Sequence, residues 1–189
     1  MTYAEANKID FAKIPVIDIT LLRNGEDKNT VAQQLHQASQ NLGFIYVKNH
    51  GIPETIIQNI REDGLSFFRQ NNTIKQEVKI SKKHRGWLGF GGAKMNDNAK
   101  ADLKESFIWG YQDKRGICSE DHPLRGKNLW PNSLPNLEKN AMNFFNYADG
   151  LAKDLLKGFA IGLNLKEDFF LQTSSNPLSR ASLVYYPSQ

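Results

Sequence analysis

The side chains best suited to chemistry in this chain are few and widely spaced. It has four histidines and one cysteine, Cys118, among 189 residues. A single cysteine excludes an internal disulfide and a cysteine-based zinc site. No histidine is followed two positions later by an acidic residue, so the His-x-Asp part of a two-histidine, one-carboxylate iron site is absent. The sequence therefore predicts no metal ligands and no catalytic residues of its own.

Glycines and aromatic residues are concentrated between residues 85 and 92. Gly89 and Gly91 begin a dinucleotide-binding pattern, but its third glycine is missing, and the Gly-Lys-[Ser/Thr] end of a phosphate loop is absent too. The Gly-x-Ser-x-Gly turn of a serine hydrolase does not occur. We expect these glycines to let a loop pass close to a ligand or to another backbone segment.

The charge balance is mildly basic, with 24 Lys and Arg residues against 20 Asp and Glu. Part of the excess lies in a run of basic residues from Lys75 to Arg85, which we expect to be a solvated loop. An anion-binding edge is the alternative interpretation of the same run. The chain shows no nucleic-acid-binding motif and carries many acidic residues, so no nucleic-acid partner is expected.

Residues 14–47 read as a strand, a helix and a second strand. Residues 14–19 are short and β-branched. A capping box at 30–33 predicts the start of the helix, and Gly43 is placed to end it. Residues 44–47 are almost wholly apolar, which favours a strand buried on both faces, with Phe44 and Val47 in the core. Two strands joined by a helix predict a parallel crossover unit.

The later elements follow from the same periodicities. Helices are expected from Pro53 onward, at 73–76, at 137–163 and near 166–171, and strands at 103–109 and 182–186, with a polar loop at 113–135. Charged residues interrupt the long helix at 137–163, so Gly158 and Gly162 favour close packing over a membrane span.

The size and the N-terminus limit the remaining possibilities. A mass of 21.5 kDa suits a single domain. No apolar run approaches the roughly 20 residues that span a bilayer, and the first residues show no secretory signal. We therefore expect a cytoplasmic protein with no membrane partner.

Six short segments occur in an order that a known family shares. They are residues 14–18 (Ile-Pro-Val-Ile-Asp), 42–52 (Leu-Gly-Phe-Ile-Tyr-Val-Lys-Asn-His-Gly-Ile), 85–87 (Arg-Gly-Trp), 104–107 (Lys-Glu-Ser-Phe), 129–131 (Leu-Trp-Pro) and 183–187 (Leu-Val-Tyr-Tyr-Pro). Together they resemble the N-terminal half of the isopenicillin N synthase-like family, the Fe(II)- and 2-oxoglutarate-dependent oxygenases.

The resemblance implies an α+β fold. In that family, helices and strands form a shell around a double-stranded β-helix, or jelly roll. We expect residues 1–189 to be a single non-haem dioxygenase N-terminal domain that runs into the first barrel strand near 181–187 and leaves the barrel incomplete. The family holds iron through a His-x-Asp and a distant His in its later half, and the chain ends at Gln189, before these are expected.

The resemblance also implies a function. The chain is expected to be the N-terminal portion of an oxidoreductase that oxidises a small molecule, with a missing C-terminal catalytic half as its partner. Fe(II) and 2-oxoglutarate are implied for the full-length enzyme, and neither is expected to bind this chain alone. Val184 stands where many members carry an Asn that accompanies 2-oxoglutarate. A non-catalytic binding or interaction module is the alternative.

The resemblance finally implies a set of substrate-binding residues. Arg85 could pair a substrate carboxylate, and the hydroxyl of Tyr186 could donate a hydrogen bond to one. Glu105 and Ser106 alternate along a strand, so at most one of them faces a given pocket. The full set of candidates is His84, Arg85, Trp87, Glu105, Ser106 and Tyr186.

Overall fold

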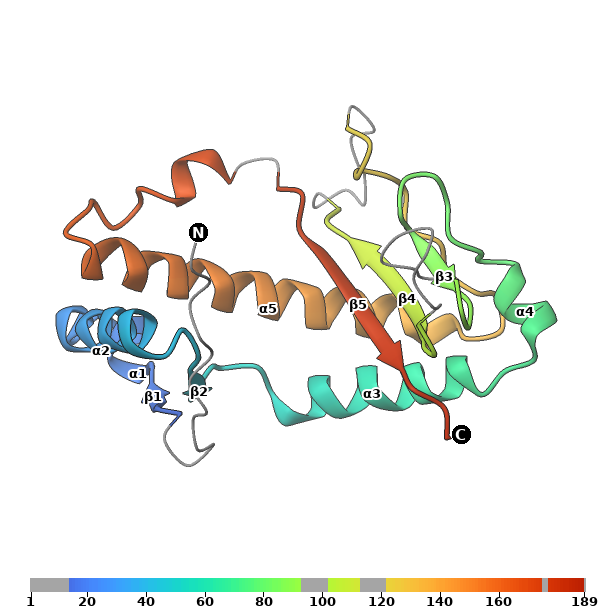
Figure 1. Cartoon of the computed structure of the whole chain (residues 1–189), viewed down its shortest axis with the longest axis horizontal. Helices are drawn as coiled ribbons and strands as arrows, with labels where there is room; N and C mark the ends of the chain where they lie inside the picture. The colour runs from blue at the N-terminus through green and yellow to red at the C-terminus, as the bar shows by residue number, and fades with distance from the viewer. Residues whose placement is uncertain (1–13, 93–101, 113–121, 175–176, 189) are drawn as a thin grey trace, which may run out of the picture. The chain divides into compact units, whose positions relative to one another are not determined.

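The computed structural model describes residues 14–92, 102–112, 122–174 and 177–188 (Figure 1). Its elements in chain order are β1 (Val16–Asp18), α1 (Thr20–Asn24), α2 (Lys28–Asn41), β2 (Tyr46–Lys48), α3 (Glu54–Phe68), α4 (Asn72–Gln76), β3 (Gly86–Leu88), β4 (Glu105–Gly110), α5 (Pro135–Gly162), the 3-10 helix η2 (Leu171–Thr173) and β5 (Arg180–Tyr185). These elements fall into two compact units. One holds residues 1–51 and 150–175, and the other holds 52–149 and 176–189.

The first unit contains the expected crossover. Strands β1 and β2 pair in parallel, with Val16 opposite Tyr46 and Asp18 opposite Lys48, and α1 and α2 lie between them in the chain. Gly43 has a positive φ of 71°, and its N–H bonds to the Ala38 carbonyl, so it ends α2 as its position predicted.

Close helix packing in this unit explains two glycines of α5. A Cβ added at Gly158 would lie 2.7 Å from Leu35 Cδ1 and 3.0 Å from a Leu22 methyl carbon. A Cβ at Gly162 would lie 2.7 Å from the Ala32 carbonyl oxygen. The expectation of close packing at both glycines is therefore confirmed.

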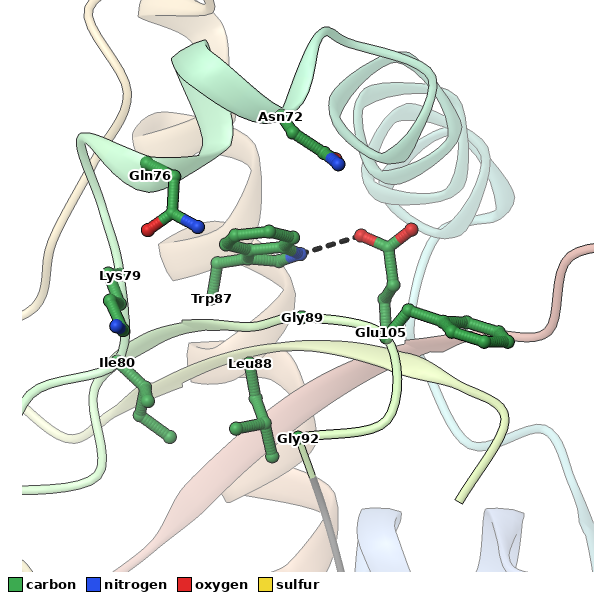
Figure 2. Close-up of a pocket in the computed structure, with 10 residues that line it drawn as sticks. Asn72, Gln76, Lys79, Ile80, Trp87, Leu88, Gly89, Gly92 and Glu105 are labelled. Carbon is green, nitrogen blue, oxygen red and sulfur yellow. Dashed lines mark hydrogen bonds between the residues drawn. The ribbon is translucent and has the colours of Figure 1, made fainter. Parts of the chain in front are cut away.

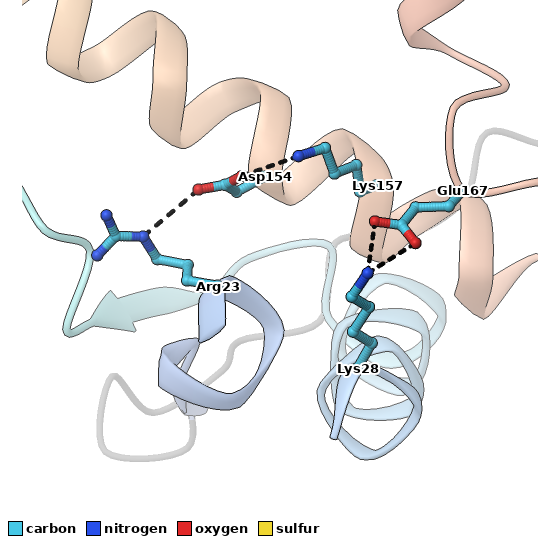
Figure 3. A network of polar contacts seen from close by, with 5 residues as sticks. All are labelled: Arg23, Lys28, Asp154, Lys157 and Glu167. Atoms are coloured by element: carbon cyan, nitrogen blue, oxygen red, sulfur yellow. Dashed lines mark hydrogen bonds and ion pairs between the residues drawn. The ribbon is translucent and has the colours of Figure 1, made fainter. Parts of the chain in front are cut away.

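A polar network also joins α1 and α2 to the C-terminal part of α5 and the turn after it (Figure 3). Asp154 lies 3.4 Å from both Arg23 Nε and Lys157 Nζ, and Lys28 Nζ lies 2.8 Å from Glu167 Oε2. These side chains are partly exposed, so each pair contributes at most about 1 kcal/mol. The apolar contacts between the helices carry most of the packing.

The second unit contains an antiparallel sheet of strand order β3-β4-β5. The register sets Trp87 opposite Phe107, and Phe107 opposite Leu183. Figure 1 shows β5 lying between β4 and α3 in this view, and a Cβ at Gly64 of α3 would meet Leu183 of β5. One face of the sheet is therefore covered by helix.

The core of this unit lies between that face and the helices. Its buried side chains come from α3, β3, β4, the N-terminal part of α5 and the segment after α4: Ile60, Phe67, Phe68, Val78, Trp87, Phe107, Trp109, Leu137, Ala141 and Phe145. Partly buried side chains of β5 pack against them. Phe67 and Phe107 approach to 4.8 Å between ring centroids, and Phe68 stacks on Tyr185 at 5.2 Å. Such aromatic pairs hold the sheet against α3.

Two local predictions in the first unit were wrong. The N-cap of α2 is Asp27, whose carboxylate accepts the Thr30 N–H at 3.0 Å, because an ionised carboxylate three residues earlier outcompetes the Thr30 hydroxyl. Phe44 is 70% exposed and Tyr46 is 54% exposed. Strand β2 begins only at Tyr46, and its exposed and half-buried residues alternate, so one of its faces is exposed and it is not buried on both faces.

Two further expectations concern the long loop and membrane-spanning helices. The loop expected at 113–135 is irregular from 122 to 134, and its first part, 113–121, lies outside the described residues. Among the residues that the structure describes, no helix is both long and apolar enough to cross a membrane.

Candidate functional site

Three of the six candidate residues, Trp87, Glu105 and Ser106, lie on the β3-β4-β5 sheet. Tyr186 directly follows β5, and these four residues divide between the two faces of the sheet. Leu88, Ser106 and Val184 form one cross-strand row, and Glu105 lies opposite Tyr185. Neighbours along a strand alternate between faces. Tyr185, like Leu183, packs against the core, so Glu105 faces the helices whereas Ser106 faces away from them. The predicted alternation of Glu105 and Ser106 is thus present.

Glu105 is the centre of a buried polar cluster on the helix-covered face (Figure 2). Its Oε2 accepts a hydrogen bond from Trp87 Nε1 at 2.7 Å and another from Lys75 Nζ at 2.8 Å. Lys75 Nζ also donates to the Phe68 carbonyl and lies 5.1 Å from the centroid of the Trp87 ring. The Lys75 ammonium compensates the charge of the Glu105 carboxylate at a place that is shielded from water. Because Lys75 is on α4, Trp87 on β3 and Glu105 on β4, the cluster joins these three elements.

A pocket of about 440 Å³ opens beside this cluster. Its lining comes from α4, the segment before β3, β3 itself, the turn after it and the start of β4: Asn72, Gln76, Lys79, Ile80, Trp87, Leu88, Gly89, Phe90, Gly92 and Glu105. Figure 2 shows Asn72 and Gln76 on one side of the pocket and Leu88 on the other. The pocket combines an ionised acceptor, two amides and aromatic surface, which is the composition of a small-molecule site.

The opposite face of the sheet is open. Ser182 is exposed, Val184 is 48% exposed and Tyr186 is 69% exposed, while Ser106 between its neighbours is 6% exposed. The face presents hydroxyl groups and apolar side chains in these rows, and the exposed Arg180 at the start of β5 adds a positive charge on the same side. It can bind and orient a ligand, but it offers no strong acid or base at the Ser106 row.

Tyr186 continues this face beyond the end of β5, close to Lys104. The pKa of Lys104 is raised, mainly by its hydrogen bond to Asp102, with the negative form of Tyr186 as a smaller cause. The Lys104 ammonium lies 2.8 Å from the Asp102 carboxylate. An ammonium and a phenol hydroxyl therefore lie near one end of the open face.

The two ends of the basic run are not solvated, contrary to expectation. Lys75 is 3% exposed and Arg85 is 1% exposed. Arg85 Nη1 donates to the backbone carbonyls of Lys83 and His84, and a Cβ at Gly110 would collide with the guanidinium. Arg85 is held by the backbone around it, because a buried guanidinium needs several acceptors. Substrate binding by Arg85 stays a prediction.

His84 differs from its neighbour. It is exposed, has a positive φ of 56° in the turn before β3, and its N–H donates to the Ser81 carbonyl. The structure brings Trp87 and Glu105 together and places Ser106 and Tyr186 on the other face. It joins neither pair to His84.

Lys75 and Asn128 are the polar residues that the sequence interpretation missed. Lys75 was included in the solvated run. Asn128 is 3% exposed, accepts the Gly110 N–H at 2.8 Å and donates to the Gly110 carbonyl at 2.9 Å. A glutamate on the inner face of a strand signals that a buried donor must exist, but the spacing does not say which lysine supplies it.

The described residues do not fit an iron ion. Nowhere in the described ranges do three His, Cys, Asp or Glu side chains come together. Glu105, the buried carboxylate of the site, already binds an ammonium and an indole N–H. The described part of the chain can thus hold a ligand, and no chemical step through a metal is derived from it.

Comparison with known protein families and proteins identifies relatives of this chain. The family described as the N-terminal part of a non-haem dioxygenase in morphine synthesis matches residues 14–133. The chain is 27% identical to the 1-aminocyclopropane-1-carboxylate oxidase of Dictyostelium discoideum, over 96% of this chain and 51% of that protein. It is also 27% identical to the isopenicillin N synthase of Streptomyces jumonjinensis, over 93% and 56% of the two chains.

Solved structures share the fold. A 2OG-Fe(II) oxygenase family protein from Caulobacter crescentus superposes with a TM-score of 0.80 at 24% identity, over 93% of this chain and 56% of that one. A full-length protein of Neurospora crassa, solved in complex with alpha-KG, superposes with a TM-score of 0.75 at 25% identity, over 92% and 54%. The chain spans about half the length of the curated relatives it matches. It belongs to the non-haem dioxygenase N-terminal family, within the isopenicillin N synthase-like Fe(II)- and 2-oxoglutarate-dependent oxygenases.

Proposed function

We propose that this chain supplies the N-terminal portion of an Fe(II)-dependent oxygenase that uses 2-oxoglutarate to oxidise a small molecule. Family membership supports the proposal, as does the fold shared with the Neurospora crassa protein that was solved with alpha-KG. The iron would be held by a segment that completes the barrel, because the described residues offer no ligand set. The chain alone would then be inactive.

The open face of the sheet is the observation that carries this proposal. Its hydroxyl groups and apolar side chains lie on three strands fixed in register, with the other face held by the aromatic core. A surface of this kind forms one wall of a substrate chamber once further strands close over it. Ser106 and Tyr186 are the two candidate residues that face it.

The outer edge of β5 gives the further strands a place to add. Within the described residues, β5 pairs with β4 alone, so its second edge carries free backbone donors and acceptors. Such an edge pairs readily with another strand. We assign residues 1–189 to one N-terminal domain that enters the barrel at 181–187, with β5 as the first barrel strand.

The end of the open face near Tyr186 favours a substrate that carries a carboxylate. The Tyr186 hydroxyl can donate a hydrogen bond to it, and the Lys104 ammonium nearby adds positive charge. The chain would bind and orient this group, and Fe(II) with 2-oxoglutarate would supply the oxidising chemistry.

The coding sequence after codon 189 tests the proposal at little cost. An oxygenase requires a His-x-Asp within the next few strands, in the same frame or in a companion frame. With strands of about 5–6 residues and short connections, that means within a few tens of residues. An immediate stop codon without a companion frame would instead favour a non-catalytic binding module.

A further inference from the structure

We propose that the pocket beside Glu105 is a second small-molecule site, specific for an uncharged, flat compound that carries N–H donors. The pocket is lined by Trp87 and Glu105 from the helix-covered face, and neither Ser106 nor Tyr186 lines it. Leu88, which shares a cross-strand row with Ser106, also lines the pocket, so the pocket adjoins the proposed substrate wall at β3 but contains neither of its candidate residues. The inference goes beyond the oxygenase role and does not depend on it.

The acceptor in this pocket is one oxygen of Glu105. Both donors that reach the carboxylate from the described residues, Lys75 Nζ and Trp87 Nε1, bond to Oε2. The side chain is 10% exposed and forms part of the pocket lining. An ionised carboxylate accepts several hydrogen bonds, so Oε1 remains for a donor brought by a ligand. Among the described residues, Oε1 is not one of the side-chain atoms that are buried without a partner, so it is accessible from the pocket.

The charges around the pocket favour a neutral ligand. The Lys75 ammonium already balances the charge of the Glu105 carboxylate. A cationic ligand would therefore be repelled by the buried ammonium and would find no second carboxylate in the lining to compensate its charge. Lys79, which also lines the pocket, adds a second positive charge against such a ligand. An anionic group placed against Oε1 would meet the carboxylate oxygen directly, and an anionic group bound at Lys79 instead would leave Oε1 without a donor. An N–H group without net charge meets neither repulsion.

The remaining lining fits a flat ring with polar edges. Asn72 and Gln76 of α4 are exposed amides that both donate and accept. Phe90 is 52% exposed and lines the pocket together with Trp87, and aromatic surface of this kind packs on planar rings. A volume of about 440 Å³ accommodates a ring compound with a short substituent.

Four benzene derivatives of nearly equal shape separate the effect of ligand charge from the effect of N–H donors. Benzamide is neutral and carries N–H donors, methyl benzoate is neutral without them, benzylamine is cationic at pH 7 and benzoate is anionic. Binding to the 189-residue chain would be followed by ligand-observed NMR and calorimetric titration, without iron or 2-oxoglutarate. Benzamide should bind on the order of millimolar. The other three should bind at least about 10-fold more weakly, because each lacks a neutral donor for the Glu105 carboxylate.

Variants on the exposed part of the lining keep the fold intact. Gln76→Leu should weaken benzamide binding by about 3- to 10-fold through loss of a neutral hydrogen bond, and Phe90→Ala should weaken it similarly. Gln33, also an exposed glutamine, lies on α2 of the other unit, so Gln33→Leu is the matched control and should change nothing. Equal binding of all four compounds, stronger binding of benzylamine or benzoate, or benzamide affinity unaffected by Gln76→Leu and Phe90→Ala would overturn the inference.

Discussion

Replacing Lys75 by methionine would remove the ammonium of the buried pair and keep most of the aliphatic stem. Glu105 would keep Trp87 Nε1 as a donor but lose its countercharge at 2.8 Å. The two side chains are only 4% and 10% exposed, so solvent screening is weak. Breaking a buried pair on one side costs about 3–5 kcal/mol. We take about 3 kcal/mol, because the indole hydrogen bond remains.

The assay is thermal unfolding followed by tryptophan fluorescence. All three tryptophans of the chain, Trp87, Trp109 and Trp130, belong to the unit that contains the pair. A chain of this length loses about 2–4 °C of melting temperature per kcal/mol. Lys75→Met should therefore lower the fluorescence-detected melting temperature by about 6–12 °C.

Two further variants decide whether charge is the cause. Lys104→Met breaks an ion pair of the same 2.8 Å length in the same unit, but at a partly exposed site where the two side chains are 28% and 48% exposed, and should change the melting temperature little. Lys75→Met with Glu105→Gln leaves a neutral acceptor for the Trp87 N–H and should recover most of the loss. The reasoning is refuted if Lys75→Met behaves like Lys104→Met, or if the double variant is no more stable than the single one.

Three other substitutions test separate parts of the structure. Gly158→Ala should lower the free energy of unfolding by about 1–3 kcal/mol, because the added Cβ meets Leu35. Gly150 has open space around it, so Gly150→Ala should raise the free energy of unfolding by about 0.5–1 kcal/mol. Chemical denaturation measures both, and equal effects would count against the packing argument. The pKa of Asp18 is lowered to about 2, first by the Thr20 hydroxyl. The contribution of ionised Asp18 to folding stability is therefore complete above about pH 4 and is lost as the pH falls toward 2. Asp18→Asn should flatten the pH dependence of the urea midpoint in that range, and an unchanged slope would contradict this prediction. Tyr186→Phe should alter the free energy of unfolding by less than about 0.5 kcal/mol, because Tyr186 is 69% exposed. It should lower kcat/KM of an assembled oxygenase by about 10- to 150-fold. A lower melting temperature with unchanged turnover would show that the residue is structural.

Local patterns located most of the elements in the chain. The alternation at 103–109 marks β4, and the apolar stripe after residue 137 marks α5, because both patterns express a periodicity that the core face imposes. Gly158 was placed correctly because a glycine beside an apolar stripe indicates a close neighbour. These features depend on residues near one another in the sequence.

The failures all depend on partners distant in the sequence. Phe44 is exposed because it precedes β2 and no described element covers it, which the apolar composition of residues 44–47 does not reveal. Lys75 is buried because Glu105, thirty positions later, needs a countercharge. Arg85 is buried because the backbone near it and Gly110 surround its guanidinium. Spacing within a basic run does not encode any of these contacts.

The division of the site between two sheet faces had the same limit. Alternation separated Glu105 from Ser106, but it did not indicate which face the helices cover. The pairing of β4 with β5 and the packing of Leu183 and Tyr185 on the core settle that.

Succinate formation from 2-oxoglutarate tests the central claim most directly. The 189-residue chain would be assayed with Fe(II) under air, alone and joined to a C-terminal segment that carries the His-x-Asp and distant His. We predict no succinate from the chain alone and sustained formation from the joined polypeptide, lost when the His-x-Asp histidine is replaced. Succinate from the chain alone, or none from a folded joined polypeptide that retains iron, would contradict the account.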